Sequence, residues 1–176
     1  MITGLNHIAM RTGNTSVMRN FYKQVLGLDI DRRRPDHFSG FHLRPQVPYG
    51  NAIVHVMTGR DAEVDDGSIP TESGAIHHLA FYAEGFEQTR AALKQYGLPW
   101  REYRIPEAGM WQIFVFDPHG VLIELTFEGM LEGIPEPPIP PGMGLDPRDR
   151  SWFDPALYRV FAQSPTEPCR AATGMP

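Results

Sequence analysis

The chain has 176 residues, of which 41% are hydrophobic, with 21 acidic and 16 basic residues and a formal net charge of -5. This size suits one compact domain or two small packed modules, and the acidic balance argues against a nucleic-acid partner. The single cysteine, Cys169, excludes an intrachain disulfide. Because no stretch resembles an export signal or a membrane span, we expect a cytoplasmic protein with no membrane partner.

Residues 1–58 predict one strand, one helix and three further strands, in that order. Residues 5–11 read as the first strand. Apolar residues then recur at the spacing of one helical face, with Asn14 or Thr15 as the N-cap and Gly27 as the stop. Three short strand-type runs follow, at residues 28–33, 38–43 and 52–58.

The second half of the chain repeats this order at an offset of about 70 residues. The segment Leu5–Met10 aligns with Ile76–Phe81, so that His7 falls opposite His78. Two further matches at nearly the same offset pair Gly27-Leu28 with Gly97-Leu98 and Ile53–Val56 with Leu122–Leu125. Three matches at almost one offset predict an internal duplication, and hence two modules of the same βαβββ order.

The duplication also sets the expected domain boundaries. They are a first module at 1–58, a polar linker at 59–75, a second module at 76–127 and an extension at 128–176. In the second module we expect a strand at 76–82, a helix near 86–96, and strands near 100–105, 110–116 and 121–127. A turn at 117–120 joins the last two strands, and its His119 is expected to be exposed. The extension holds ten of the 17 prolines, which predicts extended chain with one short helix near Trp152.

His7, His78 and Glu124 form the candidate metal site. The two histidines occupy equivalent strands, and Glu124 lies on the last strand of the second module. If the modules are related by a pseudo-twofold axis, their inward-facing side chains converge. Two histidines and one carboxylate with open positions are typical of non-haem Fe(II) oxygenases, although Mn, Zn, Ni and Co accept the same donors. The alternative is that the histidines are ordinary half-exposed strand residues and that Glu124 faces solvent.

Four segments resemble the vicinal oxygen chelate superfamily, which includes glyoxalase I, extradiol dioxygenases and bleomycin resistance proteins. They are LNHIAMR, FYKQVLGL, IHHLAFYA and FVFDPHGVLIEL, and the similarity covers residues 2–127 as one domain. The resemblance implies an α+β fold in which the two modules form a half-open mixed β-sheet barrel around a metal cavity. It further implies a homodimer, in which His7, His78 and Glu124 match the metal ligands and His55 matches a fourth position.

From this resemblance we expect a metal-dependent enzyme that acts on a small molecule, with Fe(II) favoured. The preferred reaction is extradiol-type dioxygenation of a small aromatic diol, with His55 as the catalytic acid/base. The residues expected to line the substrate cavity are Gln112, Phe114 and Phe116. One alternative is a glyoxalase I-type lyase or epimerase-type isomerase, with His55 as a fourth ligand. Another is a non-catalytic protein that sequesters a ligand, although such members generally lack the metal residues.

Two residues depart from the patterns of these reactions. Phe114 stands where two-domain extradiol enzymes have a tyrosine, which weakens the ring-cleavage interpretation. His55 stands where glyoxalase I has a carboxylate, which weakens the glyoxalase interpretation. The role of His55 is therefore the main difference between the two reactions.

Overall fold

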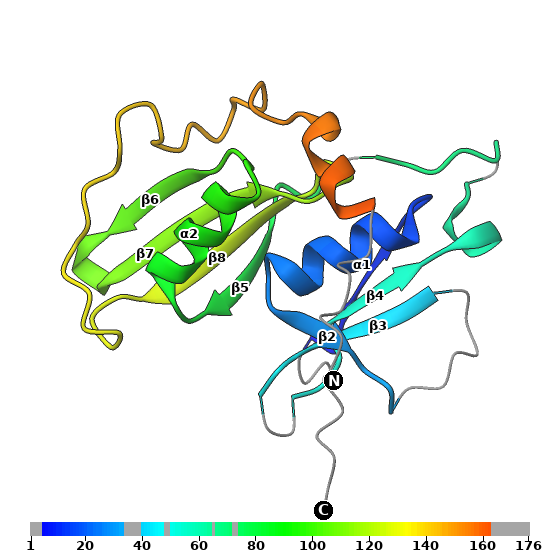
Figure 1. The fold of residues 1–176 in the computed structure, drawn as a ribbon, viewed down its shortest axis with the longest axis horizontal. Coiled ribbons are helices and arrows are strands. Elements are labelled where there is room, and N and C mark those ends of the chain that lie inside the picture. Colours follow the sequence, from blue (N-terminus) through cyan, green and yellow to red (C-terminus); the bar gives the residue numbers. More distant parts are fainter. Residues whose placement is uncertain (1–4, 34–39, 48–49, 65, 72–73, 163–176) are drawn as a thin grey trace, which may run out of the picture.

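The computed structural model describes residues 5–33, 40–47, 50–64, 66–71 and 74–162, and it contains two βαβββ modules (Figure 1). The first module consists of β1 (Ile8–Arg11), α1 (Thr15–Gln24), β2 (Leu28–Ile30), β3 (Gly40–Pro45) and β4 (Val54–Met57). The second consists of β5 (Leu79–Ala83), α2 (Phe86–Gln95), β6 (Arg101–Ile105), β7 (Met110–Phe116) and β8 (Leu122–Glu128). Three 3-10 helices lie outside this repeat or between its strands: η1 (Gly59–Ala62), η2 (Pro106–Ala108) and η3 (Pro155–Ala162). The predicted α+β fold with two repeated modules is confirmed.

Each module forms its own four-stranded mixed sheet. The strand orders are β1-β4-β3-β2 and β5-β8-β7-β6, so corresponding strands occupy corresponding places. The first and last strands of each module pair in parallel, and the other neighbours pair antiparallel. The registers also agree, because Ala9 lies beside His55 just as Ala80 lies beside Glu124. His55 and Glu124 therefore hold equivalent positions in the two sheets.

The two helices begin by different means. At α1 the side-chain oxygen of Asn14 accepts a hydrogen bond from the backbone N–H of Val17 at 3.1 Å, as the sequence predicts for an N-cap. At α2 the N-cap is Gly85, which has no side chain to offer. A carboxylate oxygen of Glu132 in the extension instead accepts from the N–H groups of Gly85 and Phe86, each at 3.1 Å. The extension thus completes the start of α2.

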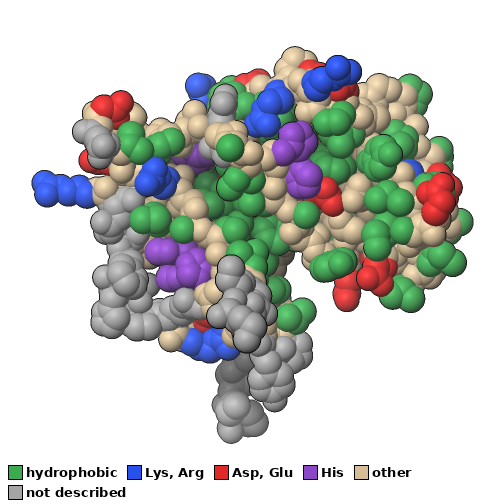
Figure 2. Space-filling view, turned by 180° about the vertical axis from the view of Figure 1, so that it is seen from behind, with side chains coloured by type: hydrophobic (Ala, Val, Ile, Leu, Met, Phe, Trp, Pro, Cys, Tyr) green, Lys and Arg blue, Asp and Glu red, His purple; other side chains and the backbone are tan. Residues whose placement is uncertain are grey.

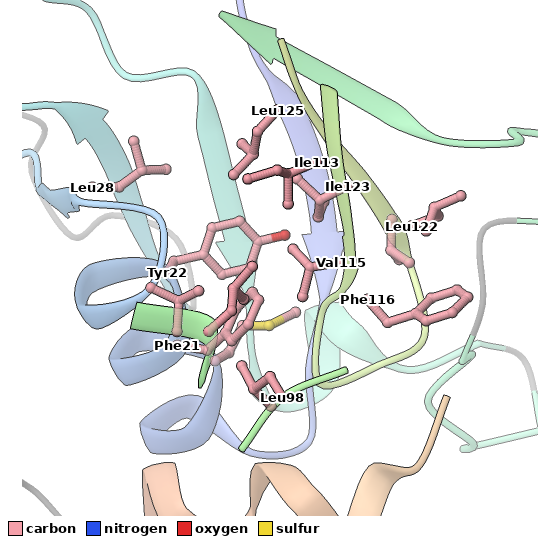
Figure 3. Close-up of a cluster of buried hydrophobic side chains, with 14 of the residues drawn as sticks. Phe21, Tyr22, Leu28, Leu98, Ile113, Val115, Phe116, Leu122, Ile123 and Leu125 are labelled. Atoms are coloured by element: carbon pink, nitrogen blue, oxygen red, sulfur yellow. The ribbon is translucent and has the colours of Figure 1, made fainter. Parts of the chain in front are cut away.

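One helix covers one face of each sheet and leaves the other face open (Figure 1). Side chains alternate between these faces along a strand, so that Val54 is buried while the neighbouring His55 is half-buried. Figure 3 shows the apolar side, where Phe21 and Tyr22 of α1 lie beside Val115 of β7. The apolar faces of both modules therefore share one core, and the polar side chains at alternate positions remain on the open faces.

In the described part of the chain, polar contacts at the turn after β7 join the two modules. The hydroxyl of Tyr22 donates to buried Asp117 at 3.2 Å, and Asp117 also accepts from the backbone N–H groups of His119 and Val121 at 2.9 Å. His119 Nε2 lies 2.7 Å from the hydroxyl of Thr12 in the first module. Burial raises the pKa of Asp117 to about 7 and lowers the pKa of His119 below its usual range. The expectation that His119 is exposed is wrong, because this turn packs against the first module.

The extension follows the second module and crosses one end of its sheet. Its backbone pairs with the edge strand β6, where Glu102 N–H donates to Met143 O at 2.8 Å and Leu145 N–H donates to Glu102 O at 3.1 Å. Further along, the ring of Trp152 packs against Phe116 with centroids 4.2 Å apart. The extension therefore reaches from the edge of the sheet to the open face beside β7.

The described part of the extension ends on the first module. The 3-10 helix η3 packs against α1, and the side-chain amide of Asn20 donates to the carbonyl of Phe161 at 2.7 Å. The predicted short helix is thus confirmed, while residues 163–176 lie outside the described residues. No helix within the described ranges is both long and apolar enough to cross a membrane.

Candidate metal centre

Three histidines gather on the open face of the first sheet. His7 immediately precedes β1, His42 lies on β3 and His55 lies on β4. Their ligand-capable atoms all lie within 4.8 Å of one another. The rings of His42 and His55 stack with centroids 4.1 Å apart, and His7 meets both of them edge-on. We call this group the first half-site.

The first half-site suits a divalent metal ion. Imidazole nitrogens are good ligands for Fe, Co, Ni and Zn. A metal–nitrogen bond is about 2.0–2.1 Å long, so two donors on one ion lie at most about 4.2 Å apart. The histidine cluster needs only small ring movements to meet this limit.

The open face of the second sheet carries a histidine and a carboxylate, which we call the second half-site. His78 Nε2 lies 3.0 Å from Glu124 Oε2. Glu124 is only 9% exposed, and its other oxygen accepts from the hydroxyl of Thr126 and the side-chain amide of Gln112, each at 2.7 Å. These bonds fix the carboxylate and direct Oε2 at His78. Glu124 is therefore a buried strand residue that does not face solvent, and its burial is matched by polar partners.

The predicted ligands fall into two groups, each within one module. Figure 2, which views the molecule from behind, shows histidine side chains gathered in separate places on this face. Among the residues that the structure describes, the first half-site is the one group of three or more candidate ligands that could share an ion. A site that contains His7, His78 and Glu124 together therefore requires the two open faces to approach each other.

The three residues expected to contact substrate all lie on β7, at alternate positions. Gln112 bonds the carboxylate of Glu124, and Phe114 lies directly opposite Glu124 in the ladder. The ring of Phe114 also meets His78 edge-on, with centroids 6.1 Å apart. Phe116 is 1% exposed because aromatic side chains of the extension cover it. Gln112 and Phe114 thus adjoin the second half-site, whereas Phe116 packs beneath the extension.

His42 is the member of the first half-site that the sequence interpretation missed. It pairs with His55 in the ladder between β3 and β4, just as Phe114 pairs with Glu124 between β7 and β8. His42 is therefore the counterpart of a phenylalanine, and a search for repeated polar residues passes over it. The hairpin itself carries the signal, since pairing β3 with β4 places His42 beside His55.

Comparison with known families and structures agrees with this fold. A sequence profile of the Glyoxalase/Bleomycin resistance protein/Dioxygenase superfamily matches residues 4–125. No curated protein matches the chain.

Three solved structures illustrate the likeness. A glyoxalase family protein from Bacillus anthracis is 18% identical with a TM-score of 0.54, and the match covers 72% of this chain and 96% of that one. Lactoylglutathione lyase from Agrobacterium tumefaciens is 16% identical, with a TM-score of 0.51 and coverage of 73% and 96%. The fosfomycin resistance protein FosX from Listeria monocytogenes is 15% identical, with a TM-score of 0.52 and coverage of 72% and 94%. At these identities the structures establish the shared fold alone, and the profile match establishes that the chain belongs to the Glyoxalase/Bleomycin resistance protein/Dioxygenase superfamily.

Proposed function

We propose that the protein is a metal-dependent dioxygenase that opens the ring of a small aromatic diol beside its two hydroxyl groups. The observation that carries this proposal is the division of the candidate ligands between equivalent places in the two modules. His7 in the first half-site, with His78 and Glu124 in the second, supplies two imidazoles and one carboxylate. That donor set suits Fe(II) in oxygenases, and Mn(II) is the next candidate.

We infer that two copies of the chain build each complete site. Within one chain the two half-sites are separate groups. In a twofold dimer the first module of one copy can face the second module of the other, and the same contact then occurs twice. Each dimer in this proposal holds two sites, and every site takes His7 from one copy and His78 with Glu124 from its partner.

The surrounding residues have distinct proposed tasks. When bound, the metal would act as a Lewis acid toward the adjacent hydroxyl groups of the diol. His55 lies in the same cluster as His7, where a neutral imidazole can accept the proton of a phenolic hydroxyl. Gln112 holds the carboxylate of Glu124 in place, and Phe114 offers an aromatic surface to a flat substrate.

Oxygen consumption tests the reaction directly. Protein reconstituted with Fe(II) under anaerobic conditions and then given oxygen and a panel of catechols should consume oxygen and form a yellow ring-opened product. The matched control is the Glu124→Ala variant treated in the same way. Iron-loaded protein that takes up no oxygen with any member of a broad panel contradicts the proposal.

A lyase or isomerase is the second candidate, and the position of His55 favours it. Among the described residues, His55 belongs to the one group of three candidate ligands that could share an ion, so it can act as a fourth ligand. In that case the protein should work with Ni(II), Co(II) or Zn(II), should need no oxygen, and should exchange a substrate C–H with solvent. Elemental analysis of purified protein separates the candidates, because iron or manganese favours ring cleavage and nickel or zinc favours proton transfer.

A further inference from the structure

The residue before His7 and the residue before His78 each contact the ring of the histidine that follows. Asn6 Oδ1 lies 2.6 Å from His7 Nδ1, and His77 Nδ1 lies 2.8 Å from His78 Nδ1. Asn6 and His77 are counterparts in the internal repeat, because LNH aligns with IHH. The same contact therefore occurs once in each module, although the two residues differ in type.

In the first module this contact determines which ring nitrogen of His7 carries hydrogen. An amide oxygen can only accept a hydrogen bond. His7 Nδ1 must therefore donate to Asn6 Oδ1, and in the neutral ring Nε2 is left with a free lone pair. Metal coordination requires such a lone pair, so the contact prepares Nε2 of His7 as the ligand atom.

In the second module the same result follows from a chain of three contacts. The carbonyl oxygen of Pro147, in the extension, lies 3.2 Å from His77 Nε2 and can only accept. His77 Nε2 therefore carries the hydrogen, and its Nδ1 accepts from His78 Nδ1. When the ring of His78 is neutral, its Nε2 is left with a lone pair on the side of Glu124, whose carboxylate oxygen lies 3.0 Å away. Two donor atoms this close together can bind one divalent metal, because donors on a single ion lie at most about 4.2 Å apart.

We propose that Asn6 and His77 are positioning residues that hold His7 and His78 in the Nδ1–H form and so present both Nε2 atoms to the metal. The inference rests on the proposed metal site. It adds that the extension takes part, since the carbonyl of Pro147 orients His77. Contacts of this kind behind a ligand usually change metal affinity by about 10- to 100-fold when they are removed.

Three variants of His77 separate its two contacts. His77→Ala loses both contacts. His77→Asn keeps an acceptor at the place of Nδ1, as Asn6 does in the first module, but does not reach Pro147. His77→Gln can still donate to Pro147 but places no acceptor against His78 Nδ1.

The quantity to compare is the metal affinity of the natural protein and the three variants at one fixed pH, measured by competition with a chelator. We expect His77→Ala and His77→Gln to bind metal about 10- to 100-fold more weakly, and His77→Asn to stay within about threefold of the natural protein. Equal affinity in all four proteins overturns the proposal. So does an equal loss in all three variants, or a Gln variant that binds better than the Asn variant.

Two further measurements keep this test independent of stability and of the proposed function. Long-range 1H–15N spectra of the metal-free protein should show Nδ1–H at His78 in the natural protein and in His77→Asn, and a mixture of tautomers in His77→Ala. Thermal unfolding of the metal-free variants checks that all are folded. If His78→Ala retains full metal, the proposed site is wrong. If His78→Ala loses metal but His77→Ala binds normally, only the positioning role is wrong.

Discussion

The open faces of the two sheets share one backbone plan but differ in chemistry. The first face carries three imidazoles, of which His42 and His55 stack on each other. The second carries one imidazole and a carboxylate that two neighbouring side chains hold in place. It is also bordered by the extension, which packs on Phe116 and reaches His77. The first face thus offers imidazole nitrogens alone, and the second offers an imidazole with a carboxylate that is held in place beside a covered edge.

This difference indicates how a duplicated fold can form an asymmetric site. The repeat supplies equivalent positions, namely His7 with His78 and His55 with Glu124. Glu124 stands where the first module has His55, and its carboxylate places negative charge on one side of the proposed metal. The first face then retains a histidine, His55, that can take part in proton transfer.

The largest effect is expected when one half-site is disabled in one chain and the other half-site is disabled in its partner. His7→Ala and Glu124→Ala should each abolish metal binding at the composite site, since each removes a ligand from every site. When the two variants are co-expressed with different tags, random pairing makes about half of the dimers mixed, and each mixed dimer has one intact site. We therefore expect about a quarter of the natural metal content and activity to return.

The matched control for this experiment is Glu128→Ala, which removes an exposed carboxylate from the same strand as Glu124. That variant should keep full metal content. If mixing His7→Ala with Glu124→Ala restores neither metal nor activity, then the half-sites do not combine between chains.

The next effect distinguishes His55 from His42 on the first face. If His55 is the acid/base, His55→Gln should lower kcat by about 100- to 10,000-fold while metal content stays unchanged. His42→Gln removes the ring that stacks on His55 and should lower kcat by about tenfold or less. Steady-state kinetics with metal analysis on the same samples checks both. Loss of metal in His55→Gln shows instead that His55 is a ligand, which favours the lyase or isomerase.

Much of the fold can be predicted from the sequence because the signals are local and occur twice. Asn14 marks the start of a helix because its side chain caps the first turn, and Gly27 marks the end because glycine adopts a positive φ at little cost. The repeat supports the second helix. The ends of the strands are predicted less accurately than the ends of the helices. The first strand is expected at 5–11 but begins at Ile8, because the parallel ladder with β4 begins at Val54. Such limits depend on a partner strand far along the chain.

The site is only partly predictable, for a related reason. The sequence predicts His7 and His78 from their equivalent positions and Glu124 from its strand and the family resemblance, but none of these signals says which of them meet within one chain. The course of the extension is also not encoded locally, since proline spacing predicts extended chain and not its destination. The burial of Phe116 under aromatic side chains of the extension depends on that destination.

A smaller effect tests whether the extension stabilises the second face. Trp152 is buried against Phe116, and the guanidinium of Arg101 lies 4.9 Å from the Trp152 ring. Trp152→Ala should lower the free energy of unfolding by about 3 kcal/mol, because it leaves a cavity and removes the cation–π contact. Val160→Ala, a change at an exposed position of η3, should alter it by about 0.5 kcal/mol or less. Urea unfolding measures both, and equal effects of the two changes contradict a stabilising role for the extension.

The smallest effect concerns the contact between the modules at Asp117. Its pKa of about 7 in the folded protein exceeds the usual value near 3.8, so the folded state binds more protons than the unfolded state between these pH values. The associated stability is fully present below about pH 3.8 and is lost as the pH rises through about 7. His119 contributes with the opposite sign, because burial lowers its pKa.

Comparison with Asp117→Asn isolates the carboxyl group, since His119 is present in both proteins. Between pH 5 and pH 8 we expect the natural protein to lose about 2 kcal/mol more stability than the variant, as measured by urea unfolding at each pH. Tyr22 keeps its hydroxyl near the substituted side chain, and its raised pKa, caused first by burial, keeps it neutral throughout this range. If the free energy of unfolding changes equally with pH in the two proteins, then ionisation of Asp117 does not weaken the contact between the modules. A steeper dependence in the natural protein shows that the junction loosens as this buried carboxyl ionises.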